Sequence, residues 1–299
     1  MGQLRAWFQA TRAFSFTASI VPVFVGGAMA LYFGGDVAWR LFPLVVICSL
    51  LFHAGTNVIS EYYDYKKGVD KEHTYGSSRV LVDRLMAPKD TLIEAAIIFL
   101  AGCVIGIVFI VFRGWPIFVL GAVGLLGGVF YSAKPVGYKY FALGDLMVFI
   151  LMGPLMVIGS YFVLTGNYNS NVLFVSLPVG FLVTAILVAN NFRDIKYDRL
   201  AKVRTVATIL GFKGARAEYC LLLAGAYISI AVMAALKVFS PWVFLAFLSI
   251  PLAVRNFKVA MKSKPDSPES IAILDVQTAQ LHLVFGVLLI SSLVLGVIF

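Results

Sequence analysis

Two stretches of the sequence carry acidic side chains at a spacing that suits a cation bound by oxygen atoms. In NNFRDIKYDRLAKVRT, residues 190–205, Asn190, Asp194 and Asp198 recur every four residues. On a helix this spacing places the three side chains on one face, in successive turns. Two carboxylates and an amide oxygen suit Mg²⁺, whose coordination is commonly completed by substrate phosphates. The interspersed arginines and lysines can neutralise further phosphate oxygens, so the stretch indicates a diphosphate site.

The other acidic stretch, NVISEYYDYKKGVD, lies earlier in the chain. Asn57, Glu61 and Asp64 share a helix face at spacings of four and three, and Asp70 follows two lysines. Neither stretch contains the histidine and cysteine set that is typical of zinc sites. A single aspartate at a helix end is commonly a solvated charge. Two such clusters, each at the end of an apolar helix and mixed with basic residues, favour a shared metal–diphosphate site over separate structural roles.

The remaining polar candidates each allow two interpretations. Lys134, within YSAKPVGYKYFALGD, either contacts phosphate or faces lipid headgroups. Asp145, in the same connection, either caps the next helix or faces the cavity. His53 shares a helix face with Asn57 and can line the cavity, but we interpret His53 and His282 first as hydrogen-bonded packing residues.

The composition indicates which elements position these residues. The 299-residue chain is 61% hydrophobic and 13% charged, whereas soluble domains are about 25% charged. So much apolar surface predicts an integral membrane protein. The net charge of +9 comes from residues between apolar runs, which favours contact with the lipid bilayer over a nucleic-acid partner. The three cysteines lie in apolar runs without metal-ligand spacing and are interpreted as packing residues.

We therefore predict an all-α membrane protein, a single domain over residues 1–299 with about nine transmembrane helices around a central cavity. Nine segments approach the roughly 20 apolar residues that a spanning helix requires. They are 13–33, 41–63, 91–112, 115–133, 142–164, 172–192, 217–236, 241–257 and 277–298. The acidic stretches follow the second and sixth segments, which hints at two structurally related halves.

The distribution of basic residues predicts the orientation in the membrane. With nine helices, 21 of the 24 lysines and arginines fall on the side of the N-terminus. Such an excess marks the cytoplasmic side. We expect the N-terminus and the acidic loops, 64–90 and 193–216, to be cytoplasmic, in a bacterial or archaeal cell membrane.

The motifs are similar to those of a known family. The pattern Asn190-x-x-x-Asp194-x-x-x-Asp198 resembles the second aspartate-rich motif of the UbiA-type intramembrane prenyltransferases, and YYDYKKGVD followed by RVLVDRL resembles their first motif region. The closest resemblance is to the menaquinone-pathway branch, the 1,4-dihydroxy-2-naphthoate polyprenyltransferases. AKVRTVATILG, Gly144-Asp145 and TAQLHLVFG also look like that branch. The likeness spans nearly the whole chain.

One position departs from the family pattern. The first motif of the family usually has an asparagine four residues before its first aspartate, and here that position is Ser60. We expect Asn57 or Glu61 to replace the missing amide as a metal ligand.

The resemblance implies transfer of a polyprenyl group, with Mg²⁺ as cofactor, from polyprenyl diphosphate to an aromatic acceptor. It implies Mg²⁺ ligation, assisted by Asn190, by four catalytic aspartates: Asp64, Asp70, Asp194 and Asp198. It also implies diphosphate contacts from basic side chains: Lys67, Lys134, Lys202 and Arg204. Asn57 and Tyr131 are further candidates for the substrate site. The aromatic face of Tyr131 can stabilise an allylic cation.

Loop 64–90, with Gly68, Gly76, Ser77 and Ser78, is predicted to act as a lid that excludes water from the cation. Other acceptors stay open: hydroxybenzoate, homogentisate, a porphyrin-type alcohol or a glyceryl phosphate. A cation-coupled transporter is the competing class. Transporter acids usually lie near the bilayer midplane, whereas these acids lie at helix ends among lysines, which favours the enzyme.

Overall fold

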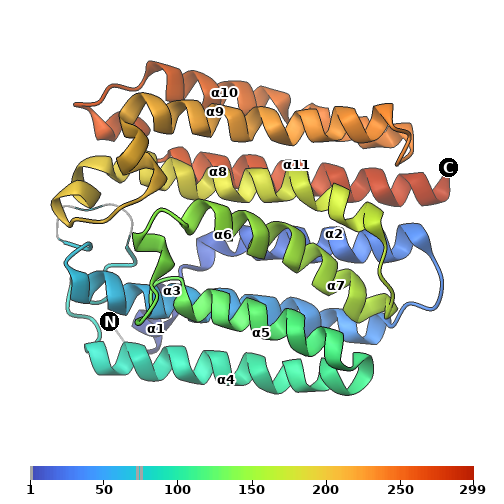
Figure 1. Ribbon diagram of the computed structural model, residues 1–299, viewed down its shortest axis with the longest axis horizontal. Helices are drawn as coiled ribbons and strands as arrows, with labels where there is room; N and C mark the ends of the chain where they lie inside the picture. The colour runs from blue at the N-terminus through green and yellow to red at the C-terminus, as the bar shows by residue number, and fades with distance from the viewer. Residues whose placement is uncertain (1–2, 72–73, 75–76) are drawn as a thin grey trace.

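The structure, a computed structural model, describes residues 3–71, 74 and 77–299, and the predicted lid residue Gly76 lies outside these ranges. The described chain is nearly all helical (Figure 1). The longer helices are α1 (Gln3–Ala10), α2 (Thr17–Phe33), α3 (Phe42–Lys67), α4 (Pro88–Arg113), α5 (Trp115–Phe130), α6 (Gly144–Ile150), α7 (Met156–Thr165), α8 (Ser170–Leu200), α9 (Val206–Ala235), α10 (Ile250–Lys262) and α11 (Leu274–Ile298). Shorter 3₁₀ or π segments are η1 (Ala13–Phe16), η2 (Trp39–Leu41), η3 (Tyr138–Tyr140), η4 (Leu151–Leu155), η5 (Pro241–Ser249) and η6 (Pro268–Ile271).

Eight helical segments of the described chain are long and apolar enough to cross a membrane. They are Gln3–Phe33, Trp39–Lys67, Pro88–Arg113, Gly144–Thr165, Ser170–Leu200, Val206–Ala235, Pro241–Lys262 and Pro268–Ile298. The predicted segment 115–133 corresponds to α5, which has only 16 residues. At 1.5 Å per residue α5 is about 24 Å long, shorter than the roughly 30 Å hydrocarbon core. The fourth predicted span is therefore a shorter apolar helix, because the helix ends before Tyr131.

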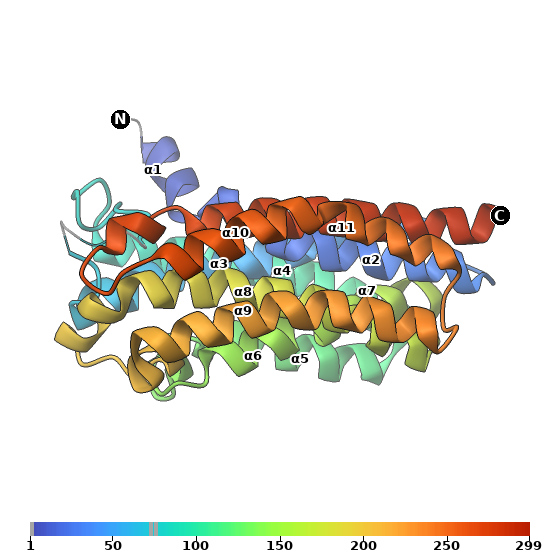
Figure 2. The ribbon, with the colours of Figure 1, turned by 90° about the horizontal axis from the view of Figure 1, so that it is seen from above.

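The helices run lengthwise beside one another, and the ends of α3 and α8 lie at the same end of the bundle, on the left of Figure 1. Helix α1 also lies at this end and projects from the bundle (Figure 2). Both acidic stretches are thus brought to one end, as the charge distribution predicts.

Helix α8 is the central helix of the bundle and α4 is a peripheral one. Of the most apolar stretch of each helix, 67% is buried in α8 and 22% in α4. Close packing of α8 against η4 depends on glycine, because a Cβ added at Gly153 would lie 2.6 Å from the Gly180 Cα. The π segment η4 also contains Pro154, whose missing N–H is compatible with an interrupted helical ladder.

Defined caps end α3 and begin the helix that follows α8. Gly68 ends α3 in the left-handed conformation, with φ 74°, and its N–H donates to the carbonyls of Asp64 and Tyr65. This is the usual glycine C-cap. Beyond α8, Thr205 and Thr208 form a capping box that begins α9. Asp64, Asp194 and Asp198 therefore lie within helices near their ends, whereas Asp70 lies just beyond the Gly68 cap.

Candidate active site

A cavity of about 830 Å³ opens at the end of the bundle where α3 and α8 terminate. On α3 its lining extends from Val45 to Asp64, a rise of about 28 Å. Its deeper walls are apolar and come from α4, α5 and η4, with side chains such as Ile107, Phe118 and Leu155. Its acidic end is lined by six carboxylates: Asp64, Asp70, Asp145, Asp194, Asp198 and Asp275. The cavity therefore joins a charged mouth to a long apolar interior.

Asp64, in the last turn of α3, is held by two donors from the connection between α5 and α6. Lys139 Nζ lies 2.6 Å from Asp64 Oδ2, and Tyr140 Oη donates to Oδ1 at 2.8 Å. Burial, together with the neighbouring Asp64, raises the pKa of Tyr140, so its hydroxyl stays a donor. These contacts orient the Asp64 carboxylate.

Arg193 organises the acidic face of α8. Its Nε and Nη2 donate to the two oxygens of Asp194 at 2.9 and 2.8 Å, and Nη2 also donates to Asn190 Oδ1. Nη1 reaches α11, where it contacts Asp275 Oδ2 at 2.8 Å and the Ala272 carbonyl at 3.2 Å. The Arg193 side chain is 2% exposed. It therefore ties the α8 motif to the start of α11.

Asp70 provides the clearest opening for a cation. Its Oδ2 is buried without a hydrogen-bond partner, although Asp70 lines the cavity. Burial, reinforced by the nearby Asp64 carboxylate, raises the pKa of Asp70 to about 7, while the Arg12 charge opposes this shift. A buried, unsatisfied oxygen of this kind costs stability unless a ligand satisfies it.

The acidic end fits Mg²⁺ without being a preformed cage. Within the described ranges, no three carboxylate, histidine or cysteine groups are close enough together to form a metal site. Mg²⁺ typically keeps several waters and takes only one or two carboxylates plus substrate phosphates. Carboxylate oxygens that already accept one hydrogen bond retain a lone pair, so Asp64 and Asp194 remain able to ligate.

The cavity brings together most of the acidic and amide residues predicted from the sequence. Seven predicted residues line it: Asn57, Asp64, Asp70, Tyr131, Asn190, Asp194 and Asp198. Five others do not: Glu61, Lys67, Lys134, Lys202 and Arg204. Four of these five are exposed basic side chains at helix ends or in loops. Lys67 lies near the site, with Nζ 4.1 Å from the centre of the Tyr140 ring. Glu61 is fully buried and contacts Arg12 instead.

The basic residues that do line the cavity, within the described chain, are Arg12, Lys139 and Arg193. Arg193 is among the interspersed basic residues that were predicted from the sequence to neutralise phosphate, but Lys134 was chosen over Lys139, and Arg12, Tyr140 and Asp275 were missed. Arg12 and Asp275 are far from both motifs along the chain and carry no local signal.

The connection 131–143 joins both acidic motifs. In addition to the contacts with Asp64, the Ala142 N–H donates to the Arg204 carbonyl at 2.6 Å, and the Arg204 N–H donates to the Tyr140 carbonyl at 3.3 Å. Ser132 accepts a hydrogen bond from Ser60 at 3.1 Å. The connection is therefore fastened to α3 on one side and to the α8–α9 loop on the other.

The two histidines of interest differ in their surroundings. His53 lines the cavity and contacts the hydroxyls of Ser19 and Ser15 at 2.7 and 3.2 Å. His282 is fully buried in α11, and neither ring nitrogen has a hydrogen-bond partner. Asp145 also lines the cavity and accepts a hydrogen bond from Asn191 at 3.0 Å.

Comparisons with known proteins agree with this geometry. The chain is 32% identical over 296 residues to a 1,4-dihydroxy-2-naphthoate octaprenyltransferase of Bacillus subtilis, covering 99% of this chain and 94% of the relative. It is 31% identical to the human UbiA prenyltransferase domain-containing protein 1, covering 98% and 86% of the two chains.

Among solved structures, a UbiA homologue from Archaeoglobus fulgidus bound to GPP and Mg²⁺ superposes with a TM-score of 0.61 at 17% identity, over 96% of this chain and 99% of that one. A digeranylgeranylglyceryl phosphate synthase gives a TM-score of 0.62 at 17% identity, over 100% and 99%. These likenesses show a shared fold. The model of the UbiA prenyltransferase family matches residues 19–274, and the chain therefore belongs to that family.

Proposed function

We propose that the chain transfers a polyprenyl group from polyprenyl diphosphate to 1,4-dihydroxy-2-naphthoate, with Mg²⁺ as cofactor, in menaquinone biosynthesis. The observation that carries the proposal is the common cavity of Asp64 and Asp194, residues from α3 and α8 that are 130 positions apart in the chain. The similarity to the octaprenyltransferase of Bacillus subtilis supports the choice of acceptor.

The acidic end is suited to hold the diphosphate with Mg²⁺. Asp70 and Asp198 are the most available ligands, because neither forms an ion pair with another described residue, whereas Asp64 and Asp194 do. Asn190 adds an amide oxygen on the same face of α8. The chemistry that Mg²⁺ supplies when bound is neutralisation of the charge on the departing diphosphate oxygen.

Basic side chains of the cavity wall complete the binding of the anion. Lys139 and Arg12 lie beside the carboxylates of α3 and line the cavity. Their cationic groups stabilise the negative charge that grows on the diphosphate as the carbon–oxygen bond breaks. In this role Lys139 replaces Lys134, whose side chain is exposed outside the cavity.

The apolar interior accommodates the isoprenoid chain and excludes water. Water must be kept from the allylic cation, since it would capture that cation before the acceptor does. The Tyr131 ring lines the cavity near the acidic end and can face the cation through its π electrons. A carbon of the acceptor ring then attacks the allylic cation and forms the new carbon–carbon bond. The bond between the ring and its carboxylate breaks, CO₂ leaves, and the electron pair of that bond restores the aromatic ring.

The proposed orientation places the acidic end on the cytoplasmic side. The loops at that end carry most of the lysines and arginines of the chain, and such loops are usually cytoplasmic. The water-soluble acceptor would then enter from the cytoplasm, and the diphosphate product would leave to the cytoplasm. Cysteine substitutions in loop 201–205 that react with a membrane-impermeant thiol reagent only in inverted vesicles would support this orientation.

Reconstitution in liposomes tests the function. Wild-type protein with Mg²⁺, octaprenyl diphosphate and 1,4-dihydroxy-2-naphthoate should release pyrophosphate and form the prenylated naphthoquinol, detected by mass spectrometry. Asp198→Asn should lower turnover about a hundredfold or more, because a charged ligand is lost. Product from hydroxybenzoate, homogentisate or glyceryl phosphate alone would reassign the acceptor. Solute flux without pyrophosphate release would overturn the enzyme assignment.

A further inference from the structure

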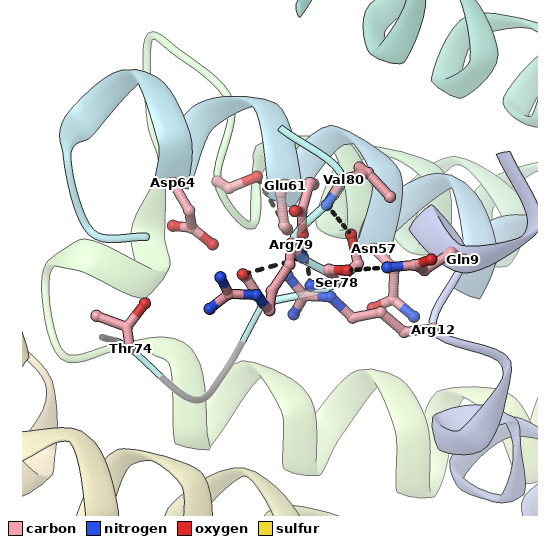
Figure 3. A network of polar contacts seen from close by, with 12 residues as sticks. Gln9, Arg12, Asn57, Glu61, Asp64, Thr74, Ser78, Arg79 and Val80 are labelled. Carbon is pink, nitrogen blue, oxygen red and sulfur yellow. Dashed lines mark hydrogen bonds and ion pairs between the residues drawn. The ribbon is translucent and has the colours of Figure 1, made fainter. Parts of the chain in front are cut away.

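The face of α3 that carries the first acidic motif packs against the N-terminal segment of the chain, residues 3–16 (Figure 3). Arg12 Nη2 donates to Glu61 Oε2 at 2.6 Å. One turn earlier on α3, the Asn57 amide donates to the Thr11 carbonyl at 2.9 Å and to Ser15 Oγ at 3.2 Å. Two side chains that the sequence suggested as metal ligands therefore hold this segment in place.

Glu61 also holds the segment that precedes α4. The same oxygen, Oε2, accepts the Ser78 N–H at 3.0 Å, and the Ser78 carbonyl accepts a hydrogen bond from Gln9 Nε2 at 2.7 Å. One buried carboxylate thus joins three parts of the chain: α3, the N-terminal segment and residues 77–86. Figure 3 shows Glu61, Ser78, Gln9 and Arg12 within one network of polar contacts.

The burial of Glu61 separates it from the metal site. Glu61 is 0% exposed and does not line the cavity, although Asp64, three residues later, does. Its Oε2 is occupied by Arg12 and Ser78, whereas its Oε1 is buried without a hydrogen-bond partner. Removing one partner of a buried ion pair is costly. We therefore assign the Glu61 carboxylate to the ion pair with Arg12.

The backbone of Arg12 supports a specific role for this pair. Arg12 lies between α1 and η1 and has the left-handed conformation, with φ 53° and ψ 50°. A non-glycine residue adopts this conformation at a cost and keeps it where surrounding contacts impose it. The result is that the Arg12 guanidinium faces the cavity, close enough to Asp70 and Asp64 to interact electrostatically with both.

We propose that Glu61 is a positioning residue, which holds the Arg12 guanidinium at the cavity wall and fixes residues 77–86 against the N-terminal segment, and that it is not a metal ligand. This inference rests on the proposed function for the role of Arg12 toward the diphosphate. Without Glu61, Arg12 loses its anchor, and the affinity for the anionic substrate falls while the Mg²⁺ ligands stay in place.

Hydrogen–deuterium exchange of the full chain in detergent tests the positioning role without any measurement of activity. In Glu61→Gln, amides of residues 77–86 and 3–12 should exchange about tenfold faster or more, because a charge-assisted hydrogen bond is removed. Residues 190–200 should exchange as in the wild type. Asp83→Asn is the matched control: it breaks an exposed ion pair with Arg79 in the same segment, and exchange should change by about twofold or less.

Kinetics on the same proteins separates positioning from ligation. Glu61→Gln should raise KM for polyprenyl diphosphate about tenfold with the half-saturating Mg²⁺ concentration unchanged, and adding Arg12→Gln should change KM little further, since the two side chains act as one unit. Asp64→Asn should shift the Mg²⁺ requirement instead. Should Glu61→Gln not fold, Gln9→Ala keeps the ion pair and should still speed exchange in residues 77–86.

Two results would overturn the proposal: unchanged exchange in both segments of Glu61→Gln, or an Mg²⁺ requirement shifted as far as that of Asp64→Asn. A wild-type protein that lacks prenyl transfer would instead refute the proposed function, and the exchange result would still decide the positioning role.

Discussion

The Lys139 ammonium lies 2.6 Å from the Asp64 carboxylate, and this ion pair connects the loop after α5 to the last turn of α3. The loop is also hydrogen-bonded to the backbone of Arg204, beyond α8. A third segment therefore sets the distance between the two acidic motifs. The Lys139 side chain is only 19% exposed, so its charge acts on the cavity rather than on bulk water.

Lys139 should be the lysine of this loop that contributes to turnover. We expect Lys139→Gln to lower kcat/KM about a hundredfold, because a cation aimed at the developing charge is lost. Lys134→Gln, five residues earlier and exposed, should stay within about twofold of the wild type. Steady-state kinetics in liposomes checks both. The reverse order of effects would return the phosphate contact to Lys134.

The ion pair between Arg193 and Asp275 should control the affinity for Mg²⁺ through its effect on Asp194. Asp275→Asn removes one of the two carboxylates that hold Arg193. Arg193 keeps its contacts with Asp194 and the Ala272 carbonyl and its charge then acts more strongly on Asp194, so the half-saturating Mg²⁺ concentration should rise about tenfold, as is usual when the partner of a ligand is lost.

Glu269→Gln is the control for this change, since it removes an exposed carboxylate from the preceding turn. Its Mg²⁺ titration should match that of the wild type. If Asp275→Asn lowers only thermal stability and leaves the Mg²⁺ titration unchanged, Asp275 has a purely structural role.

Helical periodicity was sufficient to predict the parts of the site that lie on long helices. Asn190, Asp194 and Asp198 recur every four residues, and all three line the cavity from α8. The apolar runs likewise predicted the spans, because burial in lipid requires continuous helices. The bounds differ: α5 is shorter than predicted, whereas α8 continues to Leu200 and α9 begins at Val206, since an apolar run does not define where a helix ends.

The loop residues and the partner of Glu61 could not be predicted in the same way. Lys134 and Lys139 lie in one connection, and the choice between them depends on hydrogen bonds to Tyr131 and Arg204 that no local pattern encodes. Glu61 has the helical spacing of a ligand, but its carboxylate forms an ion pair with Arg12, 49 residues away in the chain. Long-range contacts decided both outcomes.

Mg²⁺ binding should strengthen as the pH rises through about 7. The pKa of Asp70 is raised from 3.8 to about 7, chiefly by burial. Below this value Asp70 carries a proton that Mg²⁺ must displace, and above it the carboxylate is already ionised. The affinity should therefore fall up to tenfold per pH unit below the pKa of Asp70 and level off above it.

Calorimetric Mg²⁺ titrations in several buffers measure the number of protons released on binding. Asp70→Asn should bind more weakly and release about one proton fewer in mildly acidic buffer. An identical proton release in wild type and Asp70→Asn would show that Asp70 does not titrate with metal binding.

Gly121 should determine how long an isoprenoid chain the cavity accepts. It lines the cavity from α5, about 15 Å of helix from Tyr131 at the acidic end, and a Cβ added there meets no atom within 4 Å. A leucine at this position therefore projects into the apolar interior without a clash, and it improves the helix propensity of α5.

We expect Gly121→Leu to lower kcat/KM for octaprenyl diphosphate about tenfold or more relative to geranyl diphosphate. Val123→Leu, on the lipid-facing side at 44% exposure, should leave that ratio unchanged. Equal losses for both substrates in Gly121→Leu would place the isoprenoid chain along another wall.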